Sequence, residues 1–293
     1  MLFDNRKLRY FILMLGTFLL LAAGMNTPAE SRQDTVFFEA LQKKLVADGF
    51  DPSWIQALYR RPEVRVETRG VSLFLRHSEA KLNYDQFTTA KSIRKARKYM
   101  KTHASDLEAA ENAYGVDKTV ITAIILVETR LGTVVGRRSV LNSLSTMAAL
   151  GGPEARNRFW DQVSGGSDYT RAQYDKWADR RSRWAYGELK AFLTYVTAEN
   201  IKPWSLPGSY AGALGIAQFM PTNVLALARD GNNDGRIDLL NHADAIASVA
   251  NYLKYYGWES GQTRDAAARV VYRYNHSTYY VNTVLKISTL LKG

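Results

Sequence analysis

The sequence contains no cysteine, so neither disulfides nor a lipid-modified cysteine can contribute to this protein. A bacterial lipoprotein needs a cysteine just after its leader, where Met25 stands here. Internal repeats and low-complexity tracts are also missing. With 46% hydrophobic and 23% charged residues, the composition is that of a folded globular protein. Its stability must come from burial of a core, with a bound metal as a further source.

Long apolar runs are also scarce, except near the beginning of the chain. Arg6, Lys7 and Arg9 precede the uncharged run 10–24, and the small residues Ala22 to Gly24 suit a cleavage site. This pattern predicts a secretory signal peptide within residues 1–29. The run is somewhat short for a membrane-spanning helix, but an uncleaved N-terminal anchor remains the alternative. We therefore expect a periplasmic protein that is not a lipoprotein.

Acidic residues are outnumbered, since 39 lysines and arginines face 28 aspartates and glutamates, a formal net charge of +11. Residues 1–29 carry three basic groups and one acidic group, so the chain without them keeps +9. A basic surface favours polyanions such as nucleic acid, anionic lipid or an acidic cell-wall polymer. The export signal and the absence of a nucleic-acid-binding motif favour the cell-wall polymer, with weak contact to an anionic membrane as a further use. No motif specifies an oligomeric state.

Apolar residues recur at helical spacing through most of the chain after residue 35, and no alternating strand pattern is evident outside residues 151–183. Residues 151–183 contain Gly-Gly-Pro, Gly-Gly and clustered charges, and we interpret them as an insertion of unassigned fold. Residues 204–215 are predicted to form a loop. The basic run within 89–114 is interpreted as a solvated helix face. The predicted helices cover residues 37–46, 52–58, 89–114, 117–132, 184–198, 219–229, 242–256 and 277–291.

The segment 117–132 is the most informative of these helices. Asp117 is suited to cap its start and Gly132 to end it in a left-handed conformation. The residues between are apolar nearly all round, which is typical of a buried central helix. Glu128 is the one acidic residue after the cap, and it shares a helix face with Ile124 and Ile125.

A carboxyl group on such an apolar face is poorly solvated, which raises its pKa. A glutamate that keeps its proton near neutral pH is what cleavage of a glycosidic bond requires, because the leaving oxygen must be protonated. The alternative is a structural salt bridge to Arg130 or Arg137, although residues two apart do not share a helix face.

A second chemical motif begins at Asp230. In the segment DGNNDGRID, oxygen-bearing side chains alternate, a glycine suits a sharp turn and an aliphatic residue follows, as in a calcium-binding loop. The twelfth position, usually a bidentate acid, is Asn241, whereas the fifteenth is an aspartate. A metal-free turn is the alternative. The predicted Ca²⁺ ligands are Asp230, Asn232, Asp234, the carbonyl oxygen of Arg236, and Asp244.

Four motifs together carry a resemblance to a known family. ETRLG at 128–132, GSYAGALGIAQFMP at 208–221, the 230–253 loop and helix, and YNHSTYYV at 274–281 occur in the order and spacing of the membrane-bound lytic murein transglycosylase B family. The similarity extends over roughly residues 35–291. It implies a mainly α fold with a lysozyme-like helical core at about 116–293, an EF-hand-type calcium loop and a helical N-terminal lobe at about 30–115. Residues 30–293 would form one catalytic domain.

The resemblance also implies a reaction. Glu128 would protonate the oxygen between N-acetylmuramic acid and N-acetylglucosamine in peptidoglycan. It would then act as base on the muramic acid C6 hydroxyl, giving a 1,6-anhydro end without water. One carboxyl group suffices because the substrate supplies the nucleophile. No organic cofactor is expected. By match to the family's groove, the predicted substrate-binding residues are Ser209, Gln218, Phe219, Met220, Tyr252, Tyr274, Asn275 and Tyr280, and Tyr84 is a candidate match to a further groove tyrosine.

For each of these aromatic residues, core packing is the alternative interpretation. The chain departs from the family at His276, where asparagine is more usual, at Thr278 and Tyr279, and throughout 151–183. Whether cleavage starts from chain ends or within strands is therefore left open. Two other functions also remain at this point: a lysozyme-type hydrolase that uses water, and a wall-binding module without chemistry.

Overall fold

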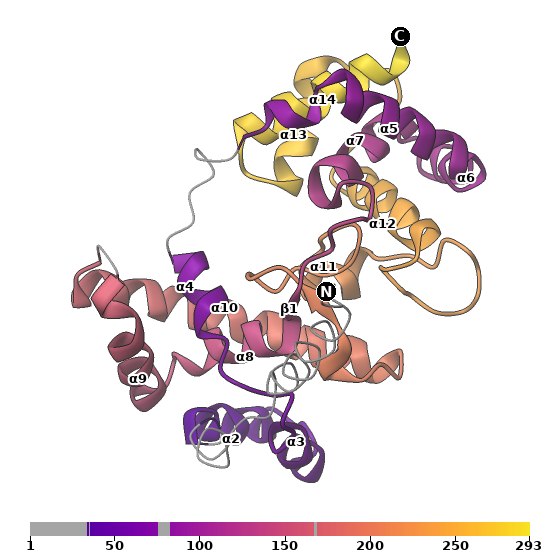
Figure 1. Ribbon diagram of the computed structural model, residues 1–293. Coiled ribbons are helices and arrows are strands. Elements are labelled where there is room, and N and C mark those ends of the chain that lie inside the picture. The colour runs from indigo at the N-terminus through magenta and orange to yellow at the C-terminus, as the bar shows by residue number, and fades with distance from the viewer. Residues whose placement is uncertain (1–33, 35, 76–82, 167–168) are drawn as a thin grey trace, which may run out of the picture.

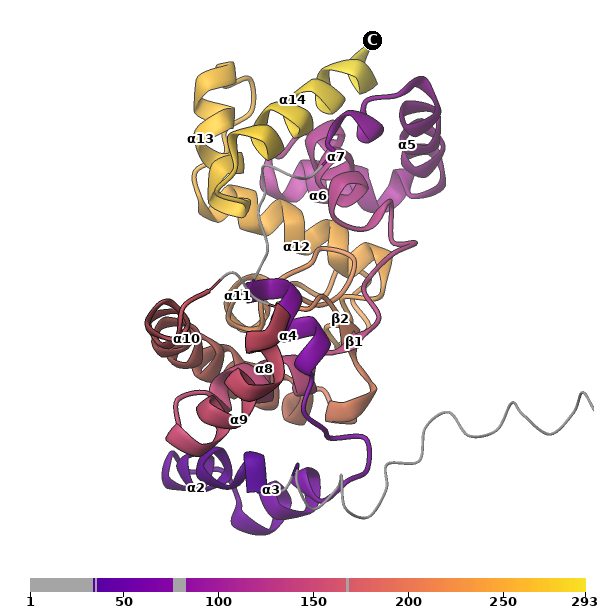
Figure 2. The same ribbon diagram turned by 60° about the vertical axis from the view of Figure 1, so that its left-hand side comes forward.

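The computed structural model describes residues 34, 36–75, 83–166 and 169–293 (Figures 1 and 2). The predicted leader within 1–29 lies outside these residues. In the described part, no helix is long and apolar enough to cross a membrane. The molecule is mainly helical, as predicted. Its helices are α2 (Glu39–Ala47), α3 (Pro52–Tyr59), α4 (Thr68–Leu75), α5 (Ala90–Thr102), α6 (Ala104–Tyr114), α7 (Lys118–Thr129), α8 (Val140–Ala149), α9 (Pro153–Val163), α10 (Arg171–Ala198), α11 (Pro221–Leu227), α12 (His242–Tyr255), α13 (Arg264–Tyr274) and α14 (Thr278–Lys292), with short 3₁₀ turns η2 (Asp85–Phe87), η3 (Ser164–Gly166) and η4 (Pro203–Ser205).

The helices pack in two groups, which Figure 2 shows one above the other. In the upper group α7 lies in the centre and contacts α5, α6, α12 and α14. In the lower group α10 packs along α8, α9 and α11, while α2 and α4 contact α8. The buried side chains of both groups form one continuous hydrophobic cluster. Burial of such an apolar surface is the main stabilising contribution to a chain without disulfides.

The chain passes repeatedly from one group to the other. Residues 36–75 belong to the lower group, 90–129 to the upper, 140–227 to the lower and 242–292 to the upper. The expected N-terminal lobe of residues 30–115 is therefore divided, because α5 and α6 pack on α7 and α12 rather than on α2 and α3. Amphipathic stripes show that a helix packs against something, but they do not identify its partner.

Several helix starts follow from local sequence. The Asp51 side chain accepts a hydrogen bond from the backbone N–H of Trp54 at 2.6 Å, with Pro52 at the first helical position, as predicted. The predicted helix 89–114 is in fact two helices, since His103 leaves helical geometry with φ −111° and ψ 34°.

The described residues within 151–183 are largely helical, which the sequence pattern did not reveal. α9 begins at Pro153, and α10 begins at Arg171 instead of near Trp184. A capping box formed by Thr170 and Gln173 starts α10. Charged residues on the exposed faces concealed this long helix. Helices α4, α8 and α13 were likewise not predicted.

Two very short strands connect the middle of the molecule. β1 (Arg138–Ser139) pairs antiparallel with β2 (Pro207–Gly208), with Arg138 opposite Gly208. β2 lies within the loop predicted at 204–215, and strands of two residues leave no alternating pattern in a sequence. The pairing joins the segment that follows α7 to the glycine-rich segment 208–221. Both segments lie next to the turn that follows Glu128.

Candidate active site

Glu128 lies near the end of α7, a largely buried helix. In α7 every residue from Thr119 to Leu126 is buried, and Asp117 caps the helix by accepting the N–H of Thr119 at 3.4 Å. Val127 and Glu128 are partly exposed. The predicted central helix is therefore confirmed, and its glutamate is at the position where the helix meets the surface.

The helix ends earlier than predicted, at Thr129. Arg130 and Leu131 adopt left-handed conformations, with φ of 51° and 65°, before Gly132 with φ 80°. Two consecutive left-handed residues other than glycine are uncommon and cost energy. A Cβ at residue 132 would lie 2.7 Å from the ring of His242, so a side chain there would clash.

Hydrogen bonds from Thr129 hold this turn in place. Its hydroxyl donates to the carbonyl of Ile216 at 3.0 Å and accepts the N–H of Gly132 at 3.0 Å. The Arg130 guanidinium reaches Gln86 Oε1 at 2.7 Å. Thr129 and Arg130 thus connect the Glu128 turn to segment 208–221 and to η2. Sequence reasoning assigned them no such roles, although both belong to the ETRLG motif.

The carboxyl group of Glu128 receives a hydrogen bond from Tyr280 on α14. The Tyr280 hydroxyl donates to Glu128 Oε1 at 2.6 Å, and the tyrosine is 1% exposed. Burial, followed by the nearby charge of Glu128, raises the pKa of Tyr280 well above its ordinary value. Tyr280 therefore keeps its proton and remains a donor throughout the physiological range.

A row of aromatic rings continues from Tyr280. Its ring lies parallel to that of Tyr274, with centroids 6.4 Å apart, and edge-on to Tyr84 at 6.5 Å. Tyr274 contacts Phe219 at 5.9 Å and Tyr252 at 4.8 Å. The predicted aromatic residues are thus brought together beside Glu128, and Tyr84, the residue before η2, joins them.

The buried part of this row has packing roles. Phe219 is 2% exposed and Tyr252 is 4% exposed. The Tyr252 hydroxyl donates to the carbonyl of Arg273, and the Tyr274 hydroxyl donates to the carbonyl of Ala217, both at 2.6 Å. These rings hold α12 and α13 against segment 208–221. Direct contact of Phe219 and Tyr252 with a ligand remains a prediction.

The predicted polar residues shape the loops around the site. Ser209 Oγ accepts the N–H groups of Ala211 and Ala213, at 3.2 and 3.1 Å. Gln218, with φ 50°, donates its side-chain amide to the carbonyls of Gly215 and Val135. Met220 precedes α11 and Asn275 follows α13, both partly buried. Their proposed contacts with substrate remain predictions.

The candidate calcium loop lies between α11 and α12, and its acidic oxygens turn inward. Asp230 accepts the N–H groups of Asp234 and Gly235, at 3.2 and 2.8 Å. Asp244 is 1% exposed and accepts the N–H groups of Gly231 and Asp238, at 2.9 and 2.7 Å.

The remaining predicted ligands also form hydrogen bonds within this loop. Asn232 Oδ1 accepts the N–H of Asp234, and Asp234 Oδ1 accepts the N–H of Arg236. Asn241, at the twelfth position, caps α12 by accepting the N–H of Ala243. Among the described residues, no three His, Cys, Asp or Glu side chains are grouped as they would be around a metal. The ligand set therefore remains a prediction.

Comparison with known proteins places this arrangement in a family. The family model described as "Transglycosylase SLT domain" matches residues 33–270, which include the Glu128 helix, segment 208–221 and the 230–253 loop and helix. The chain belongs to the SLT-domain transglycosylases. The resemblance inferred from the sequence motifs is confirmed.

Individual relatives agree with the family assignment. Membrane-bound lytic murein transglycosylase B of Escherichia coli K12 is 34% identical over 176 residues, covering 60% of this chain but 41% of that protein. The lytic transglycosylase Slt35 of Escherichia coli, solved in complex with calcium, superimposes with a TM-score of 0.68 at 25% identity, covering 91% of this chain and 93% of that one. SltB3 of Pseudomonas aeruginosa, in complex with NAG-NAM-pentapeptide, has the same fold, with a TM-score of 0.70 at 20% identity and coverage of 90% and 80%.

Proposed function

We propose that this protein is a lytic transglycosylase that cleaves peptidoglycan glycan strands, with Glu128 as both acid and base. The observation that carries this proposal is the Glu128 carboxyl group, held by the Tyr280 hydroxyl at the open end of a buried helix. Support for the substrate comes from family membership and from a relative with the same fold that binds a NAG-NAM-pentapeptide. Peptidoglycan strands are therefore the proposed partner.

In the proposed reaction, protonated Glu128 transfers its proton to the oxygen that links N-acetylmuramic acid C1 to N-acetylglucosamine. The C1–O bond breaks, and the positive charge at C1 is stabilised by the neighbouring acetamido group. The Glu128 carboxylate then removes the proton from the C6 hydroxyl, and O6 bonds to C1. The products are an N-acetylglucosamine end and a 1,6-anhydro-N-acetylmuramic acid end, and no water is consumed.

The surroundings of Glu128 suit a mechanism with one carboxyl group. Within the described residues, Glu128 is the one carboxylate whose charge raises the pKa of Tyr274 and Tyr280. A glycosidase with two acids would place its second carboxyl group roughly 5–10 Å from the first. The Tyr280 hydroxyl, which keeps its proton, stabilises the carboxylate that forms when Glu128 gives up its proton.

We further propose that the 230–244 segment binds Ca²⁺ in a structural role. Side-chain oxygens of Asp230, Asn232 and Asp234 point into the turn, and Asp244 is buried behind it. Such oxygen donors suit a hard cation that accepts six to eight ligands, and the Arg236 carbonyl completes the proposed set. The calcium complex of the relative Slt35 is consistent with this EF-hand-type assignment.

The proposed location is the periplasm. It rests on the predicted leader within residues 1–29 and on the substrate, which lies outside the cytoplasm. The excess of basic residues suits an acidic wall polymer.

Glu128→Gln tests the catalytic assignment directly. We expect this variant to bind murein sacculi but to release no soluble muropeptides, because glutamine cannot donate the proton. The measurement is mass spectrometry of products from purified sacculi. Normal release by the variant contradicts the role of Glu128, and wild-type products that lack the anhydro group assign the enzyme to the hydrolases instead.

A further inference from the structure

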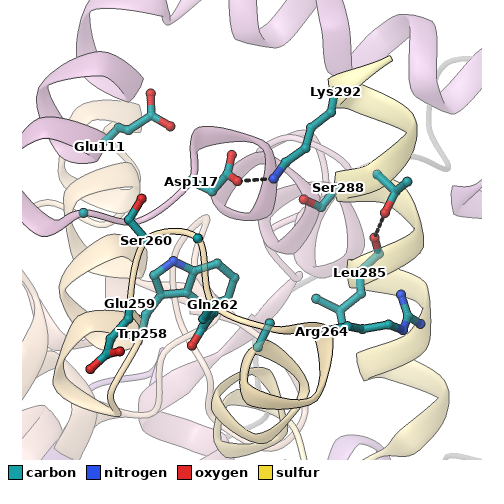
Figure 3. Close-up of a pocket in the computed structure, with 14 residues that line it drawn as sticks. Glu111, Asp117, Trp258, Glu259, Ser260, Gln262, Arg264, Leu285, Ser288 and Lys292 are labelled. Atoms are coloured by element: carbon teal, nitrogen blue, oxygen red, sulfur yellow. Dashed lines mark hydrogen bonds and ion pairs between the residues drawn. The ribbon is translucent and has the colours of Figure 1, made fainter.

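A pocket lies at the opposite end of α7 from Glu128. It has a volume of about 620 Å³ and is enclosed by the start of α7, the end of α14 and the loop between α12 and α13 (Figure 3). Asp117, which caps α7, lines it. Eleven residues of helix separate Asp117 from Glu128, or roughly 16 Å at about 1.5 Å per residue. The pocket is thus distinct from the candidate active site.

One polar group of this pocket needs a partner. The Gln262 side-chain nitrogen Nε2 is buried, and it finds no hydrogen-bond acceptor among the described residues. A buried donor without a partner costs free energy, and a ligand oxygen would remove that cost. The Gln262 amide, with its own carbonyl beside the nitrogen, matches the donor and acceptor of an acetamido group.

The pocket lining has one more acidic than basic group, although the whole chain is strongly basic: Glu111, Asp117 and Glu259 are acidic, and Arg264 and Lys292 are basic. Asp117 pairs with Lys292, as the dashed line in Figure 3 marks, and Glu111 pairs with Lys118 at 3.4 Å. Glu259 and Arg264 supply one further charge of each sign. A lining without excess positive charge, in which most charged groups are already paired, favours a neutral ligand over an anionic stem peptide.

The rest of the lining suits a sugar. Trp258 is 6% exposed, and its indole forms part of the pocket wall in Figure 3. Ser260 and Glu259 lie on the same loop and offer a hydroxyl and a carboxylate for sugar hydroxyls. A neutral ligand with hydroxyl groups, an amide and an apolar ring face satisfies all of these groups together.

We propose that this pocket is a second saccharide site, which binds an N-acetylated sugar of a glycan strand away from the cleaved bond. The inference rests on the proposed function, since the same polymer supplies the ligand. Its role is to retain the strand while Glu128 acts elsewhere on it. Two contacts on one polymer raise the effective concentration of the second.

The test is a titration of ¹⁵N-labelled Glu128→Gln protein with tri-N-acetylchitotriose, followed by NMR. The Gln262 side-chain amide signals are assigned by their loss in a second variant that adds Gln262→Ala. We expect these signals to shift with the acetylated trisaccharide and to stay still with cellotriose or D-alanyl-D-alanine. Gln262→Ala should weaken binding, read at the Trp258 indole signal, by about three- to tenfold, the worth of one hydrogen bond. Gln56→Ala, an exposed glutamine on α3, is the matched control and should have no effect.

The proposal is overturned if the Gln262 signals stay still while the sugar saturates the Glu128 site, or if cellotriose or the dipeptide shifts them equally. Failure of the proposed function is separate. If the wild-type enzyme releases no anhydro products but the sugar still shifts the Gln262 signals, the proposed activity is contradicted and the saccharide site is supported. If the wild-type enzyme is active but the Gln262 signals do not shift with the sugar, only the second saccharide site is contradicted.

Discussion

Replacing Tyr280 by phenylalanine isolates the hydrogen bond that holds the catalytic carboxyl group. The substitution removes one hydroxyl, whose oxygen lies 2.6 Å from Glu128 Oε1. It keeps the ring that stacks on Tyr274 and meets Tyr84 edge-on. The change in activity therefore measures the contact with Glu128 and little of the packing.

The size of the effect follows from the nature of this contact. A hydrogen bond to an ionised group contributes about 1.5–3 kcal/mol. Each 1.36 kcal/mol added to the activation barrier slows a reaction about tenfold. Since the tyrosine stabilises the carboxylate that forms when the proton leaves, we expect kcat to fall roughly 10- to 150-fold. KM should change little, because the lost hydroxyl is bound to Glu128 and the aromatic ring is kept.

The assay is the initial rate of release of 1,6-anhydro-muropeptides from sacculi, with the melting temperature recorded in parallel. Tyr279→Phe is the matched control, because this neighbouring tyrosine is 60% exposed. It should retain the wild-type rate. A Tyr280→Phe enzyme with unchanged kcat and a wild-type melting temperature refutes the positioning role. A rate loss that follows a collapse in melting temperature assigns Tyr280 to stability instead.

Three further predictions concern stability. Thr129→Val removes the hydroxyl that binds the Ile216 carbonyl. It should lower the free energy of unfolding, measured by denaturant titration, by about 1–3 kcal/mol and should reduce the rate of lysis. A variant with the wild-type free energy of unfolding and the wild-type rate contradicts the role of this contact. Burial raises the pKa of Glu188, which accepts two hydrogen bonds from Thr222, so the folded state binds its proton more tightly than the unfolded state does. The stability of the wild type relative to Glu188→Gln should therefore rise as the pH is lowered from 7 towards 4.5, and a constant difference in melting temperature across that range argues against it. Removal of Ca²⁺ by a chelator should lower the wild-type melting temperature, as should Asp230→Asn; an unchanged melting temperature in the chelator contradicts the calcium assignment.

The parts of the site that could be predicted from the sequence are those with local causes. Asp117 as a cap, the apolar run after it and the lone Glu128 predict a buried helix with one acid, and the structure contains that helix. The left-handed turn at Arg130 was missed because arginine seldom adopts this conformation. The neighbouring Thr129 hydroxyl holds this turn through a hydrogen bond to the carbonyl of Ile216, which lies 87 residues away in the sequence.

Sequence patterns do not show which distant residues contact one another in the site, because tertiary packing determines these contacts. Tyr280 and Glu128 are 152 residues apart, and periodicity gives no reason to pair them. The resemblance to the family brought both into one site. Phe219 and Tyr252 show the opposite difficulty, because an aromatic ring in a groove and one in a core produce the same sequence signal. Both rings are buried in this structure, and their contact with a ligand remains a prediction.

The alternation of the chain between the two helix groups has a consequence for dissecting this protein. A cut anywhere between residues 76 and 241 separates segments that belong to the same group, so no single truncation yields one complete group on its own. The ends of the chain are equally constrained, since removing α2 to α4 exposes α8, and removing α14 exposes α7. Fragments expressed to map function should therefore aggregate or remain unfolded, and point substitutions in the full chain are the informative route.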